Sequence, residues 1–217
     1  MAQEVRSPHR LIYICAAAII ADYIPVMRLP FVWCETFFHE ISHGLMAIIT
    51  GGSIVSLTLN YDGSGLCVSQ GGLLLLISFA GYFGSVVWGG LIYLLSDHMN
   101  PRYSHMMMGM LITMLLLVLV MWADKVSTYI ILGAMIVLFS AMFKFADSLL
   151  LKTLLQFIGV FVLLDAVRSP MALIDGLDRG DGWQLADITL LPEFVWIGIW
   201  LLSGLTMLFI LFRVSYK

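Results

Sequence analysis

The chain has 217 residues, of which 61% are hydrophobic and 12% are charged. Soluble domains have about a quarter of their residues charged, so this composition excludes an ordinary globular protein. The 11 Lys and Arg against 14 Asp and Glu exclude a nucleic-acid-binding chain, which would need a strongly basic surface. The remaining class is a multi-pass integral membrane protein with a single domain, residues 1–217, and we expect it in the cell membrane.

Seven apolar runs follow one another, and each approaches the ~20 residues that cross a bilayer core. They cover residues 11–27, 31–50, 72–95, 104–122, 127–146, 149–167 and 193–213. Lipid-exposed backbone must hydrogen-bond to itself, and no run alternates as porin strands do, so the runs predict helices. The first two runs are divided at Met27–Pro30 and form either a tight hairpin or one broken span. The predicted fold is therefore all-α, with six to seven transmembrane helices.

The first apolar run follows two basic residues, Arg6 and Arg10, which is also typical of a cleaved signal peptide. We favour a first membrane helix, because further hydrophobic segments follow.

The connection after the second run has a different pattern. Residues 55–61 alternate apolar and polar side chains, as a strand does, and 62–65 read Asp-Gly-Ser-Gly, which favours a turn. Residues 66–70 can return as a partner strand. The sequence thus predicts a small β-hairpin inserted between two membrane helices. Its exposed edge could pair with an extended peptide strand, or the hairpin could be a structural cap on the membrane surface.

The second run contains His39-Glu40-Ile41-Ser42-His43, an H-E-x-x-H motif. On a helix His39 and His43 lie one turn apart on the same face, so both imidazoles can bind one metal ion, and zinc is the expected ion. Glu40 is close enough to act as a general base on a zinc-bound water. Ionisable groups inside a membrane span are costly, so a functional site is the default interpretation.

Glu35 lies one helical turn before His39. Two interpretations remain open for it: a hydrogen-bond acceptor that orients His39, or a protonated or paired carboxylate at the membrane interface. Gly81, Ser85 and Gly89 recur every four residues, and this small-residue stripe predicts close packing against another helix, such as the metal-binding one.

Four segments together resemble the M50B-like branch of the site-2 protease family of intramembrane zinc metallopeptidases. They are Phe38–Gly44, Gly51-Gly52, Asp62–Gly65 and Ala80–Ser85. The similarity is close over residues 31–95, which would contain the metal-binding helix, the hairpin and the following helix. It is weaker over Asp165–Trp200, part of the region 149–213 that would contain the third ligand and the last span. The resemblance implies zinc in the membrane, two histidine ligands, a catalytic glutamate and a later aspartate as third ligand.

Two aspartates compete for that third position, and neither has the Asn-Pro element that accompanies it in the family. Asp165 ends the apolar run Leu154–Leu164, where an unpaired carboxylate is costly and metal ligation would explain it. Asp181 is the alternative, in a more polar connection. The remaining possibilities are Asp187 or no protein carboxylate. The interpretation favours Asp165.

The resulting hypothesis is an intramembrane zinc metalloprotease with Glu40 as catalytic residue and His39, His43 and Asp165 as zinc ligands. Its partners would be membrane lipid and a membrane-spanning or membrane-proximal peptide substrate, with no nucleic acid. The rival hypothesis is a zinc-binding membrane protein without proteolytic activity, such as a transporter or a scaffold. The glutamate of the motif favours the enzyme, because zinc binding alone requires only the two histidines.

Overall fold

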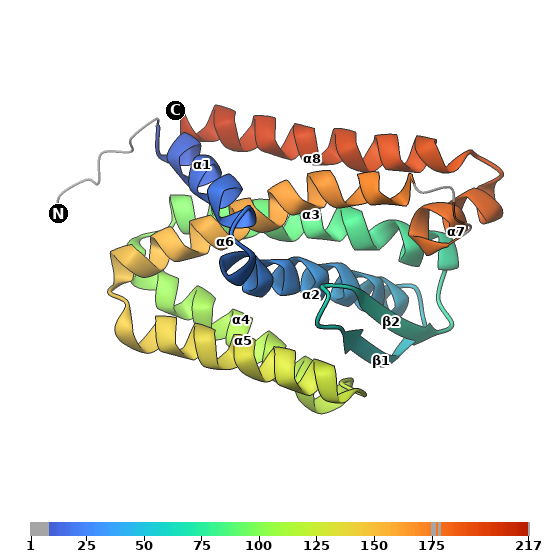
Figure 1. The fold of residues 1–217 in the computed structure, drawn as a ribbon, viewed down its shortest axis with the longest axis horizontal. Coiled ribbons are helices and arrows are strands. Elements are labelled where there is room, and N and C mark those ends of the chain that lie inside the picture. The colour runs from blue at the N-terminus through green and yellow to red at the C-terminus, as the bar shows by residue number, and fades with distance from the viewer. Residues whose placement is uncertain (1–8, 175–176, 178, 217) are drawn as a thin grey trace.

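The computed structural model describes residues 9–174, 177 and 179–216, and within them the chain is mainly helical with one two-stranded sheet (Figure 1). The long helices are α2 (Pro25–Ile49), α3 (Leu74–His98), α4 (Ser104–Met121), α5 (Val126–Phe145), α6 (Ser148–Arg168) and α8 (Glu193–Ser215). Shorter elements are α1 (Arg10–Asp22), α7 (Gly180–Thr189) and the 3-10 helices η1 (Pro101–Tyr103) and η2 (Ser169–Leu173). The predicted class, an all-α polytopic membrane protein with a small sheet, is confirmed.

Five helical segments within the described residues are long and apolar enough to cross a membrane by themselves. The pair α1 and α2 passes the same test when taken together, as a broken span or a re-entrant loop with a bend of 109°. The break lies at Tyr23-Ile24, and not at Met27–Pro30 as the sequence suggested. Pro25 is the first residue of α2, where a missing backbone N–H costs nothing, whereas Pro30 lies inside the helix.

The predicted hairpin forms directly after α2. Strands β1 (Ser53–Leu59) and β2 (Gly65–Gln70) pair antiparallel, with Ser53 opposite Gln70 at one end and Leu59 opposite Gly65 at the other. In the turn, the Asp62 carboxylate accepts the backbone N–H of Ser64, and Gly63 has a φ of 89°, which favours glycine. The Thr36 hydroxyl donates to the Gly63 carbonyl (2.6 Å), so the tip of the hairpin is fixed to the middle of α2.

The α4–α5 connection covers the outer edge of β1. The Leu57 N–H donates to the Trp122 carbonyl (2.8 Å), and the Leu59 N–H donates to the Thr128 hydroxyl (2.9 Å). Thr58 also donates its hydroxyl to Asp124 (2.8 Å). As a result, β2 provides the edge that faces away from this connection.

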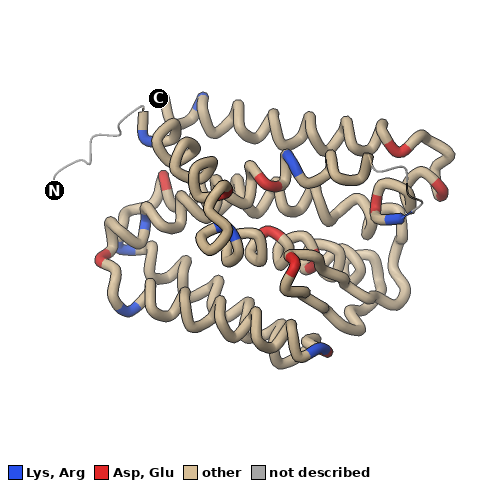
Figure 2. The backbone as a smooth tube through the Cα atoms, in the orientation of Figure 1, with Lys and Arg blue, Asp and Glu red and all other residues tan. Residues whose placement is uncertain are grey.

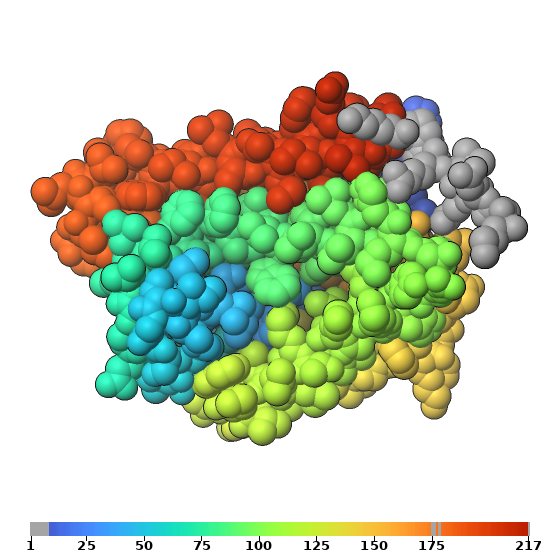
Figure 3. Space-filling view, turned by 180° about the vertical axis from the view of Figure 1, so that it is seen from behind, coloured from blue at the N-terminus to red at the C-terminus, as the bar shows by residue number. Residues whose placement is uncertain are grey.

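Helix α3 crosses the middle of the bundle, between α8 on one side and the hairpin with α4 and α5 on the other (Figure 3). It packs most closely on α6. A Cβ atom added at Gly89 would lie 2.8 Å from the Gly159 carbonyl, and one added at Gly159 would lie 2.8 Å from the Gly89 carbonyl. The two backbones therefore touch at these glycines, as small residues allow in membrane bundles.

Candidate metal centre

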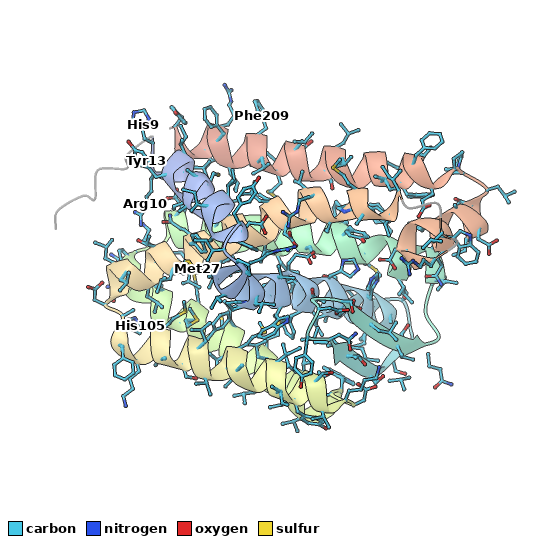
Figure 4. All side chains as sticks on the ribbon, viewed as in Figure 1. His9, Arg10, Tyr13, Met27, His105 and Phe209 are labelled. Carbon is cyan, nitrogen blue, oxygen red and sulfur yellow. The ribbon has the colours of Figure 1, made fainter. Side chains whose placement is uncertain are left out.

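Helix α2 presents both histidines of the motif on one side, as the one-turn spacing predicts. The Nε2 atoms of His39 and His43 lie 3.0 Å apart, and both side chains are largely buried. Two other described histidines, His9 and His105, lie at the opposite end of the molecule from α7 (Figure 4). There the His105 ring packs on Phe143.

Asp181 completes a group of three possible ligands. Its Oδ2 lies 3.1 Å from Nε2 of His39 and 3.3 Å from Nε2 of His43. Asp181 is in the first turn of α7, far along the chain from α2. Among the described residues, this is the one group of three or more His, Cys, Asp or Glu side chains close enough to share a metal ion.

A hydrogen bond at Nδ1 of His43 leaves Nε2 as the ring atom that can bind a metal ion. Nδ1 lies 2.6 Å from the carbonyl oxygen of Ile77 in α3 and must donate to it, because a carbonyl only accepts. The neutral ring then carries its lone pair on Nε2, toward His39 and Asp181. Metal-binding histidines are typically fixed in this way by a backbone carbonyl.

The three ligand atoms are close to the spacing that a tetrahedral zinc ion requires. Ligand atoms at ~2.0–2.2 Å from such an ion lie roughly 3.3–3.5 Å from each other. The observed separations of 3.0, 3.1 and 3.3 Å are slightly shorter. Two imidazoles and one carboxylate are also a donor set that zinc commonly takes, so the residues fit the ion.

A glycine of α3 makes room for the two imidazoles. A Cβ atom added at Gly81 would lie 2.5 Å from Cε1 of His43 and 2.6 Å from Cε1 of His39. The next member of the predicted stripe, Ser85, is buried on the same helix, but Gly89 contacts α6 instead of α2. The stripe therefore serves two different helix contacts.

Helix α7 is anchored to α3 and α8 next to Asp181. The Ser78 hydroxyl donates to Oε1 of Gln184 (2.5 Å), and Leu185 is fully buried against Trp200. Burial alone would raise the pKa of Asp181, but the neighbouring His43 and His39 outweigh burial and keep the pKa below its ordinary value. Asp181 is therefore an anionic oxygen donor at neutral pH.

Glu40 lies beside this group, beneath β2. It is 5% exposed, and it interacts electrostatically with both histidines and with Asp181. The backbone N–H of Cys67 donates to its carboxylate. A Cβ atom added at Gly65 would lie 2.5 Å from Oε1 of Glu40, so this carboxylate is in contact with the strand.

Asp165, the favoured third ligand of the sequence analysis, lies outside the group. Its Oδ1 accepts from Arg168 at 2.5 Å, and Arg168 also pairs with Asp22. The buried carboxylate in the apolar run is thus explained by an ion pair three residues later in the same helix. The structure places Asp181, the alternative candidate, at the histidines, and Asp187 is exposed on α7.

Tyr82, within the segment Ala80–Ser85, is a neighbour of the site to which the sequence assigned no individual role. Its ring packs edge-on against His39, with centroids 4.5 Å apart, and against Trp200 at 4.7 Å. Local sequence does not indicate that this aromatic side chain packs against a metal-site histidine. Its contact depends on how α3, α2 and α8 meet.

A sequence model of the Peptidase M50B-like family matches residues 11–211. The chain belongs to this family. No curated protein and no solved structure matches the chain. Membership of the M50B-like family supports a membrane metallopeptidase of the site-2 protease kind, and M50 peptidases are zinc enzymes. Together with the apolar helices it makes the chain an integral membrane protein, while the cell membrane as its location stays a prediction.

Proposed function

We propose that this protein is an intramembrane zinc metalloprotease that cleaves peptide bonds of membrane-spanning or membrane-proximal substrates. The observation that carries the proposal is the triangle of two histidine Nε2 atoms and one Asp181 oxygen, all within 3.3 Å of each other, with Glu40 beside it. The family supports the same class of activity.

In this proposal His39, His43 and Asp181 bind the zinc ion. When bound, zinc would supply a Lewis acid that polarises the scissile carbonyl and makes water more acidic. The Ile77 carbonyl keeps His43 in the tautomer that binds, and the docked helix α7 delivers the carboxylate. Gly81 keeps the space that the two rings occupy.

Glu40 would act as general base and then as general acid. It takes a proton from the attacking water and gives a proton to the leaving amine, which restores its starting state. The hydrogen bond from the Cys67 N–H holds the Glu40 carboxylate between β2 and the two histidines. The reacting peptide bond would therefore lie between β2 and the histidine pair.

The outer edge of β2, where the Cys67 N–H holds Glu40, is the proposed docking position for the substrate. The outer edge of β1 is already bonded to Trp122 and Thr128, so an added strand would pair with β2. A helical substrate shelters its carbonyls in helix hydrogen bonds and must unwind before attack. Pairing with β2 would hold the unwound segment extended against Glu40.

The experiment compares wild type, Glu40→Gln and His43→Ala, purified, reconstituted in lipid and loaded with zinc. Glu40→Gln should keep one zinc per chain and lose cleavage of a membrane peptide by roughly 100-fold or more, because it keeps the shape but removes the base. His43→Ala should lose both zinc and cleavage.

Cleavage that survives in Glu40→Gln would contradict the mechanism. If the wild-type protein binds zinc but cleaves none of the peptides, the rival function, a zinc-binding transporter or scaffold, is favoured.

A further inference from the structure

The broken first span has a group of four charged residues that the proposed metal site does not use. Asp22 at the end of α1 pairs with Arg28 at 3.1 Å and with Arg168, and Arg168 pairs with Asp165. All four belong to helices of the candidate membrane spans. Figure 2 shows acidic and basic positions of α1, α2 and α6 close together in the middle of the bundle.

The exposure of these charges indicates water close by. The side chains of Arg28 and Arg168 are each 48% exposed, although they belong to membrane spans. Arginine exposed to acyl chains is strongly disfavoured, whereas charges that line an aqueous cavity are tolerated. The non-helical break at Tyr23-Ile24 is consistent with such a cavity, since irregular backbone at membrane depth occurs where it is covered by protein or lines a water-filled space.

A cavity is present at this place. It has a volume of about 210 Å³ and lies between α1 and α6, with Asp22, Asp165 and Arg168 in its wall. Apolar side chains, including Ile19 and Leu164, form the rest of the wall. A cavity of this size has room for several water molecules, and the charged groups in its wall can bind them. We refer to it as the α1–α6 cavity.

Two buried polar groups continue from this cavity toward the histidines. Glu35 is 5% exposed and interacts electrostatically with both Asp165 and His39. Its carboxylate is also within hydrogen-bonding reach of the Ser85 hydroxyl of α3. Nevertheless, Oε1 of Glu35 and Oγ of Ser85 have no hydrogen-bond partner of normal geometry among the described residues.

Buried polar atoms that lack a protein partner are normally hydrogen-bonded to water. We therefore propose that the α1–α6 cavity is an aqueous vestibule within the membrane, and that Glu35 and Ser85 line the route by which water reaches the metal centre from it. The inference rests on the proposed hydrolytic function, because hydrolysis consumes one water per peptide bond. The break between α1 and α2 then has a role, because Asp22 and Tyr23 at the break line the cavity.

The first test measures whether the cavity contains water. In a protein with Cys15, Cys34 and Cys67 replaced by Ala and reconstituted in lipid, Ile19→Cys is compared with Ile20→Cys. The two neighbours are at the same depth of α1, both are exposed, and Ile20 does not line the cavity. A charged methanethiosulfonate reagent reacts with the thiolate in water, so we expect at least tenfold faster modification at position 19. Equal rates at the two positions, slow or fast, would overturn the vestibule.

The second test follows the route inward with Ser85→Cys and Ser96→Cys in the same background. Both serines are on α3 and at most 1% exposed, but the Ser96 hydroxyl donates to the Tyr93 carbonyl and lies off the route. A small methanethiosulfonate should modify position 85 at least tenfold faster than position 96. In the double variant Ile19→Cys with Ser85→Cys, a bulky adduct at position 19 should slow that reaction at least fivefold.

A Ser85→Cys thiol that does not react, or that reacts at the same rate with the bulky adduct in place, would overturn the route. Neither test uses peptide cleavage. If the protein proves not to be a protease, these labelling results can still be interpreted. If the labelling contradicts the route, the proposed metal site is still supported by its own geometry.

Discussion

At the scale of single residues, the carboxylates of Asp181 and Asp165 have opposite surroundings. Asp181 faces the Nε2 atoms of His39 and His43, which lie 3.0 Å apart. Two ring nitrogens this close to each other and to a carboxylate need a shared cation or proton between them. Asp165 faces the guanidinium of Arg168, which already neutralises it. The two residues therefore differ in what their removal should do.

We expect Asp181→Ala to reduce zinc affinity by more than roughly a hundredfold, because it removes a direct ligand. Asp165→Ala should keep zinc binding at the wild-type level and lower thermal stability, because Arg168 loses a partner inside the membrane. Zinc per chain, measured after dialysis against a weak chelator, distinguishes the two. If Asp165→Ala loses zinc and Asp181→Ala keeps it, our ligand assignment is wrong, and retention in both would exclude either carboxylate.

Cys67 in β2 provides a test that depends on pH. Burial, and then the negative charge of Glu40, raise the pKa of Cys67 to about 12. A raised pKa means that thiolate accumulates only as the pH approaches 12, so at pH 8 alkylation should be roughly a thousandfold slower than for an ordinary thiol. The rate should keep rising between pH 7 and 10 in a protein that carries Cys15→Ala and Cys34→Ala.

Adding Glu40→Gln to that protein should speed the alkylation, because the negative charge of Glu40 no longer raises the pKa of Cys67. The unfolded protein is the control for an ordinary thiol. A rate that levels off near pH 8.5 in the folded protein would show that Cys67 is neither buried nor near a charged Glu40.

At the scale of secondary-structure elements, α7 is the part of the chain that delivers the third candidate ligand. It is a ten-residue helix whose position depends on Leu185 and on the hydrogen bond between Gln184 and Ser78. An isolated helix of this length is unstable in water, so its docking determines where Asp181 lies.

Leu185→Ala should therefore weaken zinc binding without changing any ligand. Truncating a fully buried leucine costs about 2–5 kcal/mol, and here the loss falls on the docking of α7. We expect at least a tenfold lower zinc affinity by chelator competition. Asp187→Ala, on the exposed side of the same helix, is the matched control and should bind zinc as wild type does. Equal affinities in both variants would show that docking of α7 does not position Asp181.

At the scale of the whole molecule, the crossing of α3 and α6 fixes the distances on which the other features depend. Helix α3 carries Gly81 beside the histidines, and α6 carries Asp165 beside the α1–α6 cavity. Their backbones meet at Gly89 and Gly159, where side chains would separate them.

Gly89→Ala should destabilise the protein, because the added methyl group would lie 2.8 Å from backbone atoms of α6 that cannot move aside. Overpacking of this kind costs about 1–3 kcal/mol. Gly133→Ala in α5 is the control, since nothing lies within 4 Å of an added Cβ there, and it should be neutral or stabilising. Thermal unfolding in lipid or detergent measures both. A Gly89→Ala protein as stable as the Gly133→Ala protein would contradict the close crossing.

Much of the molecule follows from local sequence. The long apolar runs determine the membrane helices, because lipid leaves a backbone no other partner than itself. The alternation in 55–61 and the turn after it determine the hairpin, and the spacing of His39 and His43 determines that they share a helix face. Tertiary structure decided the rest: that Asp165 pairs with Arg168, that a short helix brings Asp181 to the histidines, and that the first span breaks beside a cavity. These outcomes depend on contacts between residues far apart in the chain, and no local pattern of charge or hydropathy specifies them.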